Sequence, residues 1–201
     1  MPSHVIFVRH AQTVDNVQKR YLGHRDSPLS ALGKWQEERI LDLLYTETID
    51  AVFGSDLLRA ASLAQRIAHD HHVKAQLTPD LREMNFGVFE GLTYAEVMSR
   101  YSECATAFYD DSLHMAPPSG ETGLQVLSRV LRFVKEQFFL SIRDHTELTQ
   151  TVVVVTHGGP LRLLLATLMY NDPTRHWEIN VDHGSIVRCA VSDKNEWSVC
   201  L

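Results

Sequence analysis

The chain has little of what marks disulfide-framed, membrane-bound or nucleic-acid-binding proteins. It has three cysteines, Cys104, Cys189 and Cys200, and no C-x-x-C pair. These favour reduced thiols in a cytoplasmic protein over disulfides or a zinc site. The first apolar run, 5–8, is too short for a signal peptide or a membrane span. With 19 Lys and Arg against 25 Asp and Glu, the net charge of −6 predicts neither a nucleic-acid partner nor a membrane surface.

Several catalytic motifs are also missing. The sequence contains no G-x-x-x-x-G-K-[ST] loop, no G-x-S-x-G turn and no H-E-x-x-H helix, which argues against an NTPase, a serine hydrolase and a zincin. One alternative remains open, a metal site at His69-Asp70-His71-His72. Adjacent histidines at a helix end suit solvent and the helix dipole, and no matching carboxylate set is present, so we expect neither a metal nor a cofactor.

The order of apolar segments predicts an α/β fold in a single domain, 1–201. Strands are expected at 4–8, 51–53, 73–77, 152–155, 185–192 and 197–201, mostly alternating with helices, which favours a largely parallel sheet covered on both faces. The last two strands, with a turn at 193–195, could form a hairpin at the sheet edge. If strand 185–192 lies at that edge, it could pair with a second subunit in a homodimer.

Helical periodicity predicts the side chains that face this sheet. Ser30 is a good N-cap, and further helices are expected after 51–53, over 93–108, from near Thr122 and over 160–169. The irregular segment 79–121, rich in Pro and Gly, is predicted to form a lid or one wall of a site. The first of these helices, after Ser30, carries Leu32, Ile40, Leu41 and Leu44, and the one after 51–53 carries Leu58, Leu63, Ile67 and Ala68. The helix from near Thr122 is expected to have Leu124, Leu127, Val130, Leu131, Val134 and Phe138 on its inner face.

Two predicted strands run directly into a histidine. Residues 5–8 lead into Arg9 and His10, and 152–155 lead through Thr156 into His157. Ligands bind beyond the carboxyl ends of parallel strands, so we expect both histidines at one site. His10 could be a hydrogen-bonded structural residue. Beside an arginine, however, a neutral His10 with one ring nitrogen held by a carbonyl could attack phosphorus, and nearby arginines would lower its pKa.

Three further side chains could serve chemistry on a phosphoryl group. Arg59, near the start of the helix after 51–53, is either a surface arginine or a bidentate phosphate ligand. His157, before two glycines at a helix start, is either a core histidine or, as an imidazolium, a donor to phosphate oxygens. Glu83 could be the general acid for the leaving group. Glu90 and Glu121 are other candidates for that acid, or structural hydrogen-bond acceptors.

The chain resembles the histidine phosphatase superfamily, also called phosphoglycerate mutase-like. The similar residues, in the family's order, are Arg9-His10-Ala11-Gln12-Thr13 with Asn16, the block 23–33, Ser55 and Arg59, Glu83, Gly120-Glu121, and Thr156-His157-Gly158. The resemblance implies a three-layer α/β/α sandwich and covalent, metal-free catalysis. It also implies a phosphohistidine at His10, a proton donor at Glu83, and a phosphate pocket of Arg9, Asn16, Gly23, Arg59 and His157. Four positions depart from the pattern: Ala11 for a glycine, Gln12 for the commoner Glu, and Ser62-Leu63 for Gln-Thr.

The substrate is expected to be a small phosphate ester. Family mutases carry an arginine after the acidic residue and more arginines in a longer insert, whereas here Met84 follows Glu83, and Arg82 and Arg100 are off-pattern. A phosphomonoesterase is therefore favoured over a mutase. Segments 81–91 and 177–185 resemble the members that act on α-ribazole 5′-phosphate in the cobalamin pathway. An apolar wall for its benzimidazole-like group could come from Tyr94, Phe108, Tyr109 and Met115, which could equally be core residues.

Other functions remain open at this point. Fructose bisphosphates, phosphoserine, phosphoglycerate or a broad range of small esters would suit the same chemistry. A non-catalytic relative that senses phosphate or binds a protein is a different class of function. The intact set of Arg9, His10, Arg59, Glu83 and His157 argues against that class, because loss of one of them would have favoured it.

Overall fold

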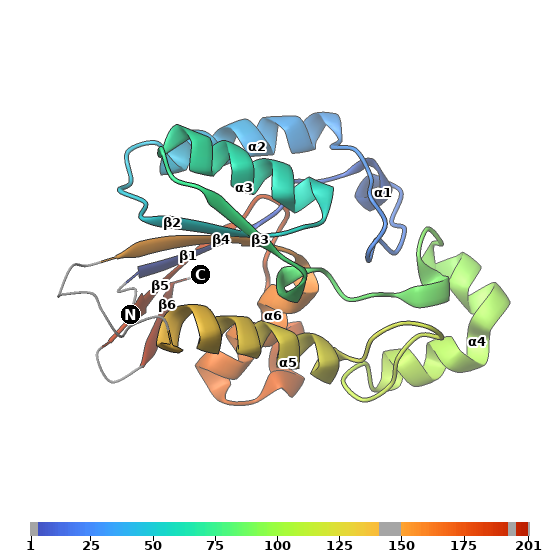
Figure 1. Ribbon diagram of the computed structural model, residues 1–201. Coiled ribbons are helices and arrows are strands. Elements are labelled where there is room, and N and C mark those ends of the chain that lie inside the picture. Colours follow the sequence, from blue (N-terminus) through green and yellow to red (C-terminus); the bar gives the residue numbers. More distant parts are fainter. Residues whose placement is uncertain (1–3, 141–149, 193–195, 201) are drawn as a thin grey trace.

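Runs of β-branched residues form the centre of one mixed sheet in the computed structural model, which describes residues 4–140, 150–192 and 196–200 (Figure 1). The order across the sheet is β3 (Ala75–Thr78), β2 (Ala51–Ser55), β4 (Thr151–Thr156), β1 (His4–Arg9), β5 (Ile186–Val191) and β6 (Trp197–Cys200). The first four strands in this order pair in parallel, whereas β5 is antiparallel to β1 and β6 is antiparallel to β5. The predicted, mostly parallel sheet is confirmed.

Helices cover both faces of the sheet and its carboxyl-terminal end. They are α1 (Val14–Val17), α2 (Ala31–Leu44), α3 (Leu58–Asp70), α4 (Tyr94–Asp110), α5 (Gly123–Val134) and α6 (Gly158–Tyr170). Figure 1 shows α2 and α3 on one face and α5 and α6 on the other, with α1 and α4 beyond the end of the sheet. Shorter helical turns lie at Pro79–Leu81, Gly87–Phe89, Lys135–Leu140 and Pro173–Glu178. The molecule is a three-layer α/β/α sandwich.

Alternation along the strands divides the core into two parts. In β1, Ile6 and Val8 belong to a hydrophobic cluster with residues of α2 and α3, whereas Val5 and Phe7 belong to one with residues of α5 and α6. All four are at most 3% exposed, and burying a side chain of this kind contributes about 1.5–3 kcal/mol. The core therefore holds the sheet rigidly between its helices.

Helix starts follow the predicted caps. The Ser30 hydroxyl accepts from the Gly33 N–H and begins α2, while Thr93 and Thr122 form capping boxes that begin α4 and α5. The expected helix over 93–108 thus exists, with a break in helical geometry at Tyr101.

The inner face predicted for the helix from near Thr122 is wrong at two residues, because Leu124 (40%) and Leu131 (37%) are exposed. Leu32 (49%) and Leu58 (64%), apolar residues of α2 and α3, are exposed as well. In α5 the buried stripe is centred on Val126, Val130 and Phe133 instead. Leu124 and Leu131 lie on its flank, because a helix packed on a sheet buries only one side of its surface.

The predicted pairing of the last two strands at the sheet edge is confirmed, but strand 185–192 is the inner one, so the condition for pairing it with a second subunit is not met. β5 pairs on one side with β1 and on the other with β6, so its main-chain groups form hydrogen bonds within the chain. The predicted hairpin partner β6 lies at the edge. The turn expected at 193–195 falls outside the described residues.

The described helices include none that is both long and apolar enough to cross a membrane. The three cysteines are free: Cys104 and Cys200 are exposed, and Cys189 is buried in β5. Burial raises the pKa of the Cys189 thiol to about 12, which makes it an inert core side chain.

Candidate active site

The parallel pairing of β1 and β4 places two histidines side by side. Arg9 and Thr156 are partners in the strand register, and the next residues are His10 and His157. Their ring centroids are 4.9 Å apart, and both rings are buried. The two histidines that were predicted to meet thus lie side by side in the structure.

The ring of His10 is held in one tautomer. Its Nδ1 lies 2.7 Å from the Ala11 carbonyl oxygen, which can only accept, so Nδ1 carries the hydrogen. Arg59 Nε donates to His10 Nε2 at 3.3 Å. Burial, and secondarily the charge of Arg59, hold the pKa of His10 well below its usual value. The neutral ring therefore presents the lone pair of Nε2, which is what attack on phosphorus requires.

Two arginines, the buried Arg59 and the half-buried Arg9, flank His10 and are held by neutral groups. Arg9 donates to the Val181 carbonyl at 2.6 Å and to His183 Nε2 at 2.8 Å, and Arg59 donates to the Gly23 carbonyl at 2.7 Å. Burial lowers the pKa of both guanidiniums, but an arginine starts so high that it stays charged. Because these hydrogen-bond partners are neutral, both positive charges remain available to an anion.

Four buried nitrogen atoms of the site have no hydrogen-bond partner among the described residues. They are Arg9 Nε, Arg162 Nε and both ring nitrogens of His157. A buried polar group left unpaired costs about 1–3 kcal/mol, and phosphoryl oxygens could accept from such donors. Burial, then the charge of Arg59, lowers the pKa of His157 well below its usual value. This corrects the expected imidazolium: the ring is neutral and donates through one N–H.

Gly158 and Gly159 allow the start of α6 to approach the site closely. A Cβ atom on Gly158 would lie 2.9 Å from Arg9 Cζ, and one on Gly159 would lie 2.3 Å from Glu83 Oε1. The two glycines thus make room for two different functional groups.

Glu83 reaches the same helix start from the loop after β3. It is 9% exposed. Its Oε1 accepts from the Met84 N–H at 2.9 Å and its Oε2 from the Gly159 N–H at 3.3 Å. Glu83 also exerts the largest charge effect on both Arg9 and Arg59. A carboxyl group in this place could exchange a proton with a bound ester.

Asn16 lines a pocket together with His183, and Gly23 contacts Arg59. The Asn16 side-chain oxygen accepts from the Thr13 N–H at 3.0 Å and from its hydroxyl at 2.9 Å, so only its amide nitrogen could serve an anion. The Gly23 carbonyl is bound by Arg59. A Cβ on Gly23 would lie 2.1 Å from Glu90 Oε1, so this turn passes too close to a carboxylate for a larger residue.

Glu90 and Glu121 are structural acceptors, as one of the two interpretations predicted. Glu90 accepts from the main-chain N–H groups of His24 at 2.8 Å and Arg25 at 3.0 Å, and Glu121 accepts from that of Asn85 at 2.8 Å. Both carboxylates therefore hold loops in place.

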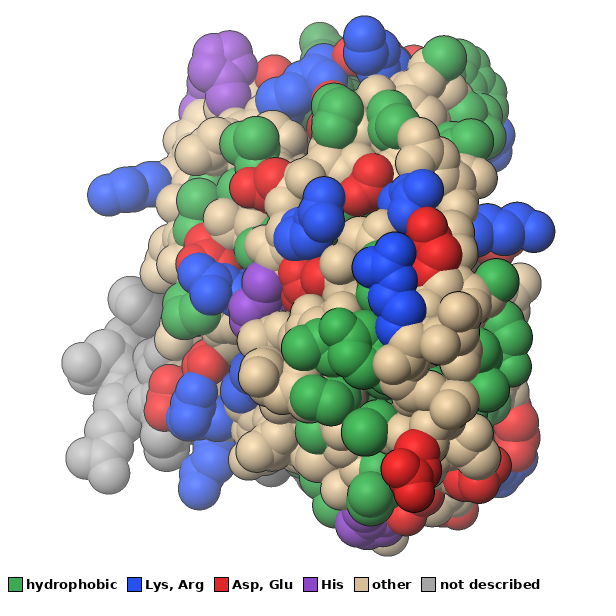
Figure 2. Space-filling view, turned by 90° about the vertical axis from the view of Figure 1, so that its right-hand side faces the viewer, with side chains coloured by type: hydrophobic (Ala, Val, Ile, Leu, Met, Phe, Trp, Pro, Cys, Tyr) green, Lys and Arg blue, Asp and Glu red, His purple; other side chains and the backbone are tan. Residues whose placement is uncertain are grey.

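A cavity of about 500 Å³ opens beside Glu83 and Gly159. Its apolar lining is Tyr21, Met84, Phe86, Tyr94, Phe108, Tyr109, Leu113, Leu163 and Trp177, with Arg162 and His176 among its polar residues. Three of the four residues expected in an apolar wall are present, and Met115 is not. Figure 2 shows hydrophobic side chains gathered on the face at the α1 and α4 end, with Lys and Arg around them.

Sequence reasoning missed three residues of the site. His183 binds Arg9, and its ring centroid lies 5.6 Å from that of His10. Arg162, one turn into α6, lines the cavity and lies over the Trp177 ring at 5.6 Å. Its place one turn after His157 was an available signal. Arg129 of α5 donates to the Glu83 carbonyl at 2.9 Å, and no local motif marks it.

The side chains of the alternative metal site, His69-Asp70-His71-His72, do not converge on one point among the described residues. His69 has a side chain 88% exposed and pairs with Asp70 at 3.2 Å. Over 4–140, 150–192 and 196–200, no three His, Cys, Asp or Glu side chains are placed to share a metal ion.

The chain belongs to the histidine phosphatase superfamily, branch 1, whose family model matches residues 5–200. It is therefore a phosphatase of that class. It is 35% identical over 178 residues to the adenosylcobalamin/alpha-ribazole phosphatase of Escherichia coli, covering 88% of this chain and 84% of the relative. It is 30% identical to phosphoserine phosphatase 1 of Hydrogenobacter thermophilus, over 90% of this chain and 83% of that one. The crystal structure of the alpha-ribazole phosphatase from Shigella flexneri superposes with a TM-score of 0.85 at 31% identity, over 95% and 92% of the two chains.

Proposed function

We propose that this phosphatase hydrolyses α-ribazole 5′-phosphate, or a close nucleotide-like ester, in cobalamin biosynthesis. The observation that carries the proposal is a cluster of donors around His10, in which Arg9 Nε and the His157 ring are unpaired, beside an aromatic cavity. A planar base suits that wall, because aromatic rings stack on one another. The similarity to two alpha-ribazole phosphatases supports the same substrate.

In the first step, His10 Nε2 attacks the phosphorus atom and the bond from phosphorus to the ester oxygen breaks. Glu83 gives its proton to the departing oxygen, so that an alcohol and not an alkoxide leaves. Arg9, Arg59 and His157 donate to the phosphoryl oxygens and stabilise the charge spread over them. The product is a phosphohistidine, and no metal ion is required for it.

In the second step, water attacks the phosphohistidine. Glu83, now a carboxylate, takes a proton from that water, and the bond from phosphorus to Nε2 breaks. Inorganic phosphate leaves, and His10 returns to its neutral form. The Ala11 carbonyl keeps the hydrogen of His10 on Nδ1 throughout.

A second substrate class is favoured by Arg162. This residue lines the cavity from α6. A guanidinium there could bind a carboxylate, and phosphoserine is the substrate named for one 30% identical relative.

The test is kcat/KM for phosphate release from α-ribazole 5′-phosphate, O-phosphoserine and p-nitrophenyl phosphate, with a chelator present. We expect a preference of about a hundredfold for α-ribazole 5′-phosphate over p-nitrophenyl phosphate, or about 2.7 kcal/mol of differential transition-state binding. Equal kcat/KM values for α-ribazole 5′-phosphate and p-nitrophenyl phosphate would contradict the assignment to cobalamin biosynthesis. A preference for O-phosphoserine would favour the second substrate class. Phosphate release unchanged in His10→Ala would contradict the mechanism itself.

Assembly and location complete the proposal: a cytoplasmic homodimer that binds neither nucleic acid nor membranes. Since β5 is paired on both sides, an intersubunit strand contact would have to use β3 or β6, the edges of the described sheet. Light scattering at micromolar concentration would measure the molar mass in solution directly, and the mass of a monomer would contradict the proposed dimer.

A further inference from the structure

One arginine of another helix makes three of the five side-chain hydrogen bonds to the carbonyl groups of residues 80–83, the loop that carries Glu83. Residues 80–83 leave the sheet after β3, so strand pairing cannot satisfy their carbonyl groups. Arg129 of α5 binds three of them. Its Nη1 donates to the carbonyls of Asp80 at 2.9 Å and Arg82 at 2.6 Å, and its Nη2 donates to that of Glu83 at 2.9 Å.

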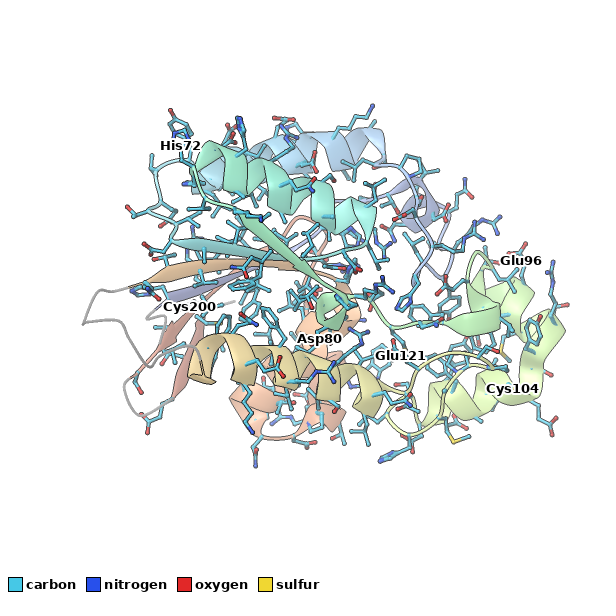
Figure 3. All side chains as sticks on the ribbon, viewed as in Figure 1. His72, Asp80, Glu96, Cys104, Glu121 and Cys200 are labelled. Carbon is cyan, nitrogen blue, oxygen red and sulfur yellow. The ribbon has the colours of Figure 1, made fainter. Side chains whose placement is uncertain are left out.

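Glu121 takes the remaining two donors of the same guanidinium. Arg129 Nε donates to Glu121 Oε1 and Nη2 donates to Oε2, both at 3.1 Å. All five N–H groups of the arginine are thus used, and its side chain is only 12% exposed. Figure 3 shows Asp80 and Glu121 beside α5, at the two ends of this contact.

Further contacts complete the loop's anchoring. The Thr156 hydroxyl at the end of β4 donates to the Leu81 carbonyl at 2.8 Å, so each of the carbonyls 80–83 is bound by a side chain. The Glu83 carboxyl accepts from Met84 of the same loop and from Gly159 of α6. His24 Nε2 also lies 3.0 Å from the Glu83 carbonyl oxygen. The position of the carboxyl therefore depends on the position of the loop, for which Arg129 supplies three hydrogen bonds.

We propose that Arg129, oriented by Glu121, is a positioning residue that holds Glu83 where it can pass its proton to the leaving oxygen. This rests on the proton-donor role proposed above for Glu83. A lysine could not replace the arginine, because a single ammonium cannot span three carbonyls and a carboxylate with the planar fork of a guanidinium. A displacement of about 1 Å at a catalytic group can cost on the order of a hundredfold in rate.

The experiment compares two leaving groups. A nitrophenolate leaves without a proton, whereas an alkoxide needs one, so loss of the proton donor affects alkyl esters most. The measured quantity is the ratio of kcat/KM for α-ribazole 5′-phosphate to that for p-nitrophenyl phosphate. kcat/KM reports the step in which the ester bond breaks and not the later hydrolysis of the phosphohistidine.

We expect Glu83→Gln to lower this ratio by about a hundredfold or more, and Arg129→Lys to lower it about tenfold, largely through kcat. Glu121→Gln, which keeps the size of the side chain but weakens its pairing with Arg129, should lower the ratio severalfold. It carries the test if Arg129→Lys does not fold. The matched control is Arg132→Lys on the same helix. Arg132 pairs with the carboxylate of Asp80 and not with the loop carbonyls, so the ratio should not change.

The outcomes separate the two proposals. If Glu83→Gln lowers the ratio but the folded Arg129 and Glu121 variants lose activity equally on both esters, the positioning role is wrong and the proton-donor role stands. If Glu83→Gln leaves the ratio unchanged, both are wrong. A lowered ratio in all three variants, with the control unchanged, supports both.

Discussion

The start of α6 shows how closely single residues set the spacing of the site. Gly158 lies against the guanidinium of Arg9, and Gly159 lies against the carboxyl of Glu83. Neither has a positive φ, so alanine would fit the helical backbone at both positions. The added methyl group would therefore act on the neighbouring functional group and not on the fold.

Alanine at these two positions should give different kinetic effects. Gly158→Ala displaces Arg9, which serves every substrate, and should lower kcat/KM about tenfold or more for alkyl and nitrophenyl esters alike. Gly159→Ala displaces Glu83 and should lower kcat/KM much more for alkyl esters than for p-nitrophenyl phosphate. Steady-state kinetics on both esters would measure these losses of kcat/KM, with thermal unfolding as a check on stability. The same pattern of losses in the two variants would contradict the prediction.

Among the elements, α4 and its flanking loops form the wall of the cavity. The Thr93 capping box begins the helix, and Arg20 ties its first turn to the loop after α1 through Glu96 at 3.0 Å. The hydroxyls of Tyr21 and Tyr109 are 2.7 Å apart and join that loop to the end of α4. The segment predicted as a lid or wall thus lines the cavity, while its role in specificity stays a prediction.

Tyr94 offers a test of that role because it is 58% exposed and its removal should leave the core intact. Its ring lies 5.2 Å from that of Tyr109 in the cavity wall. Tyr94→Ala should raise KM for α-ribazole 5′-phosphate severalfold, in line with about 0.5–1.5 kcal/mol for an aromatic contact, and leave O-phosphoserine unaffected. Tyr45→Ala, 77% exposed after α2, is the matched control. An equal rise in KM for both substrates would count against an aromatic subsite.

The whole molecule loses stability at low pH, because it buries histidines in their neutral form. Burial is the first cause of the lowered pKa values of His10 and His157. In the unfolded chain these side chains bind a proton below about pH 6.5. Between that pH and their lower folded pKa values, the unfolded state binds more protons, so stability falls as pH falls.

Urea denaturation at two pH values would measure this effect. The free energy of unfolding should drop between about pH 7.5 and 5.5, by about 1.4 kcal/mol per buried histidine for each pH unit below the unfolded pKa. His157→Gln should reduce that drop by about this amount. His69→Gln, whose side chain is 88% exposed in the folded chain, should not. A drop of unchanged size in His157→Gln would refute this explanation.

Local signals explain why much of the fold was predictable. Runs such as 5–8 and 152–155 can only be buried, and Ser30, Thr93 and Thr122 supply side-chain caps, so strands and helix starts follow from near neighbours. Leu124 and Leu131 were misplaced because the pattern does not say how far the apolar face of a helix is covered. That depends on the sheet against which the helix packs.

For the site, the sequence by itself determined which chemistry is possible. Ligands bind where parallel strands end. Two histidines at such strand ends, with arginines and a glutamate, therefore indicate phosphoryl transfer. Only the tertiary structure decided that His183, Arg162 and Arg129 belong there, and that His157 is neutral. The reason is physical: hydrogen bonds between distant segments and the loss of water around a buried ring depend on what packs nearby, and neither leaves a mark in the local sequence.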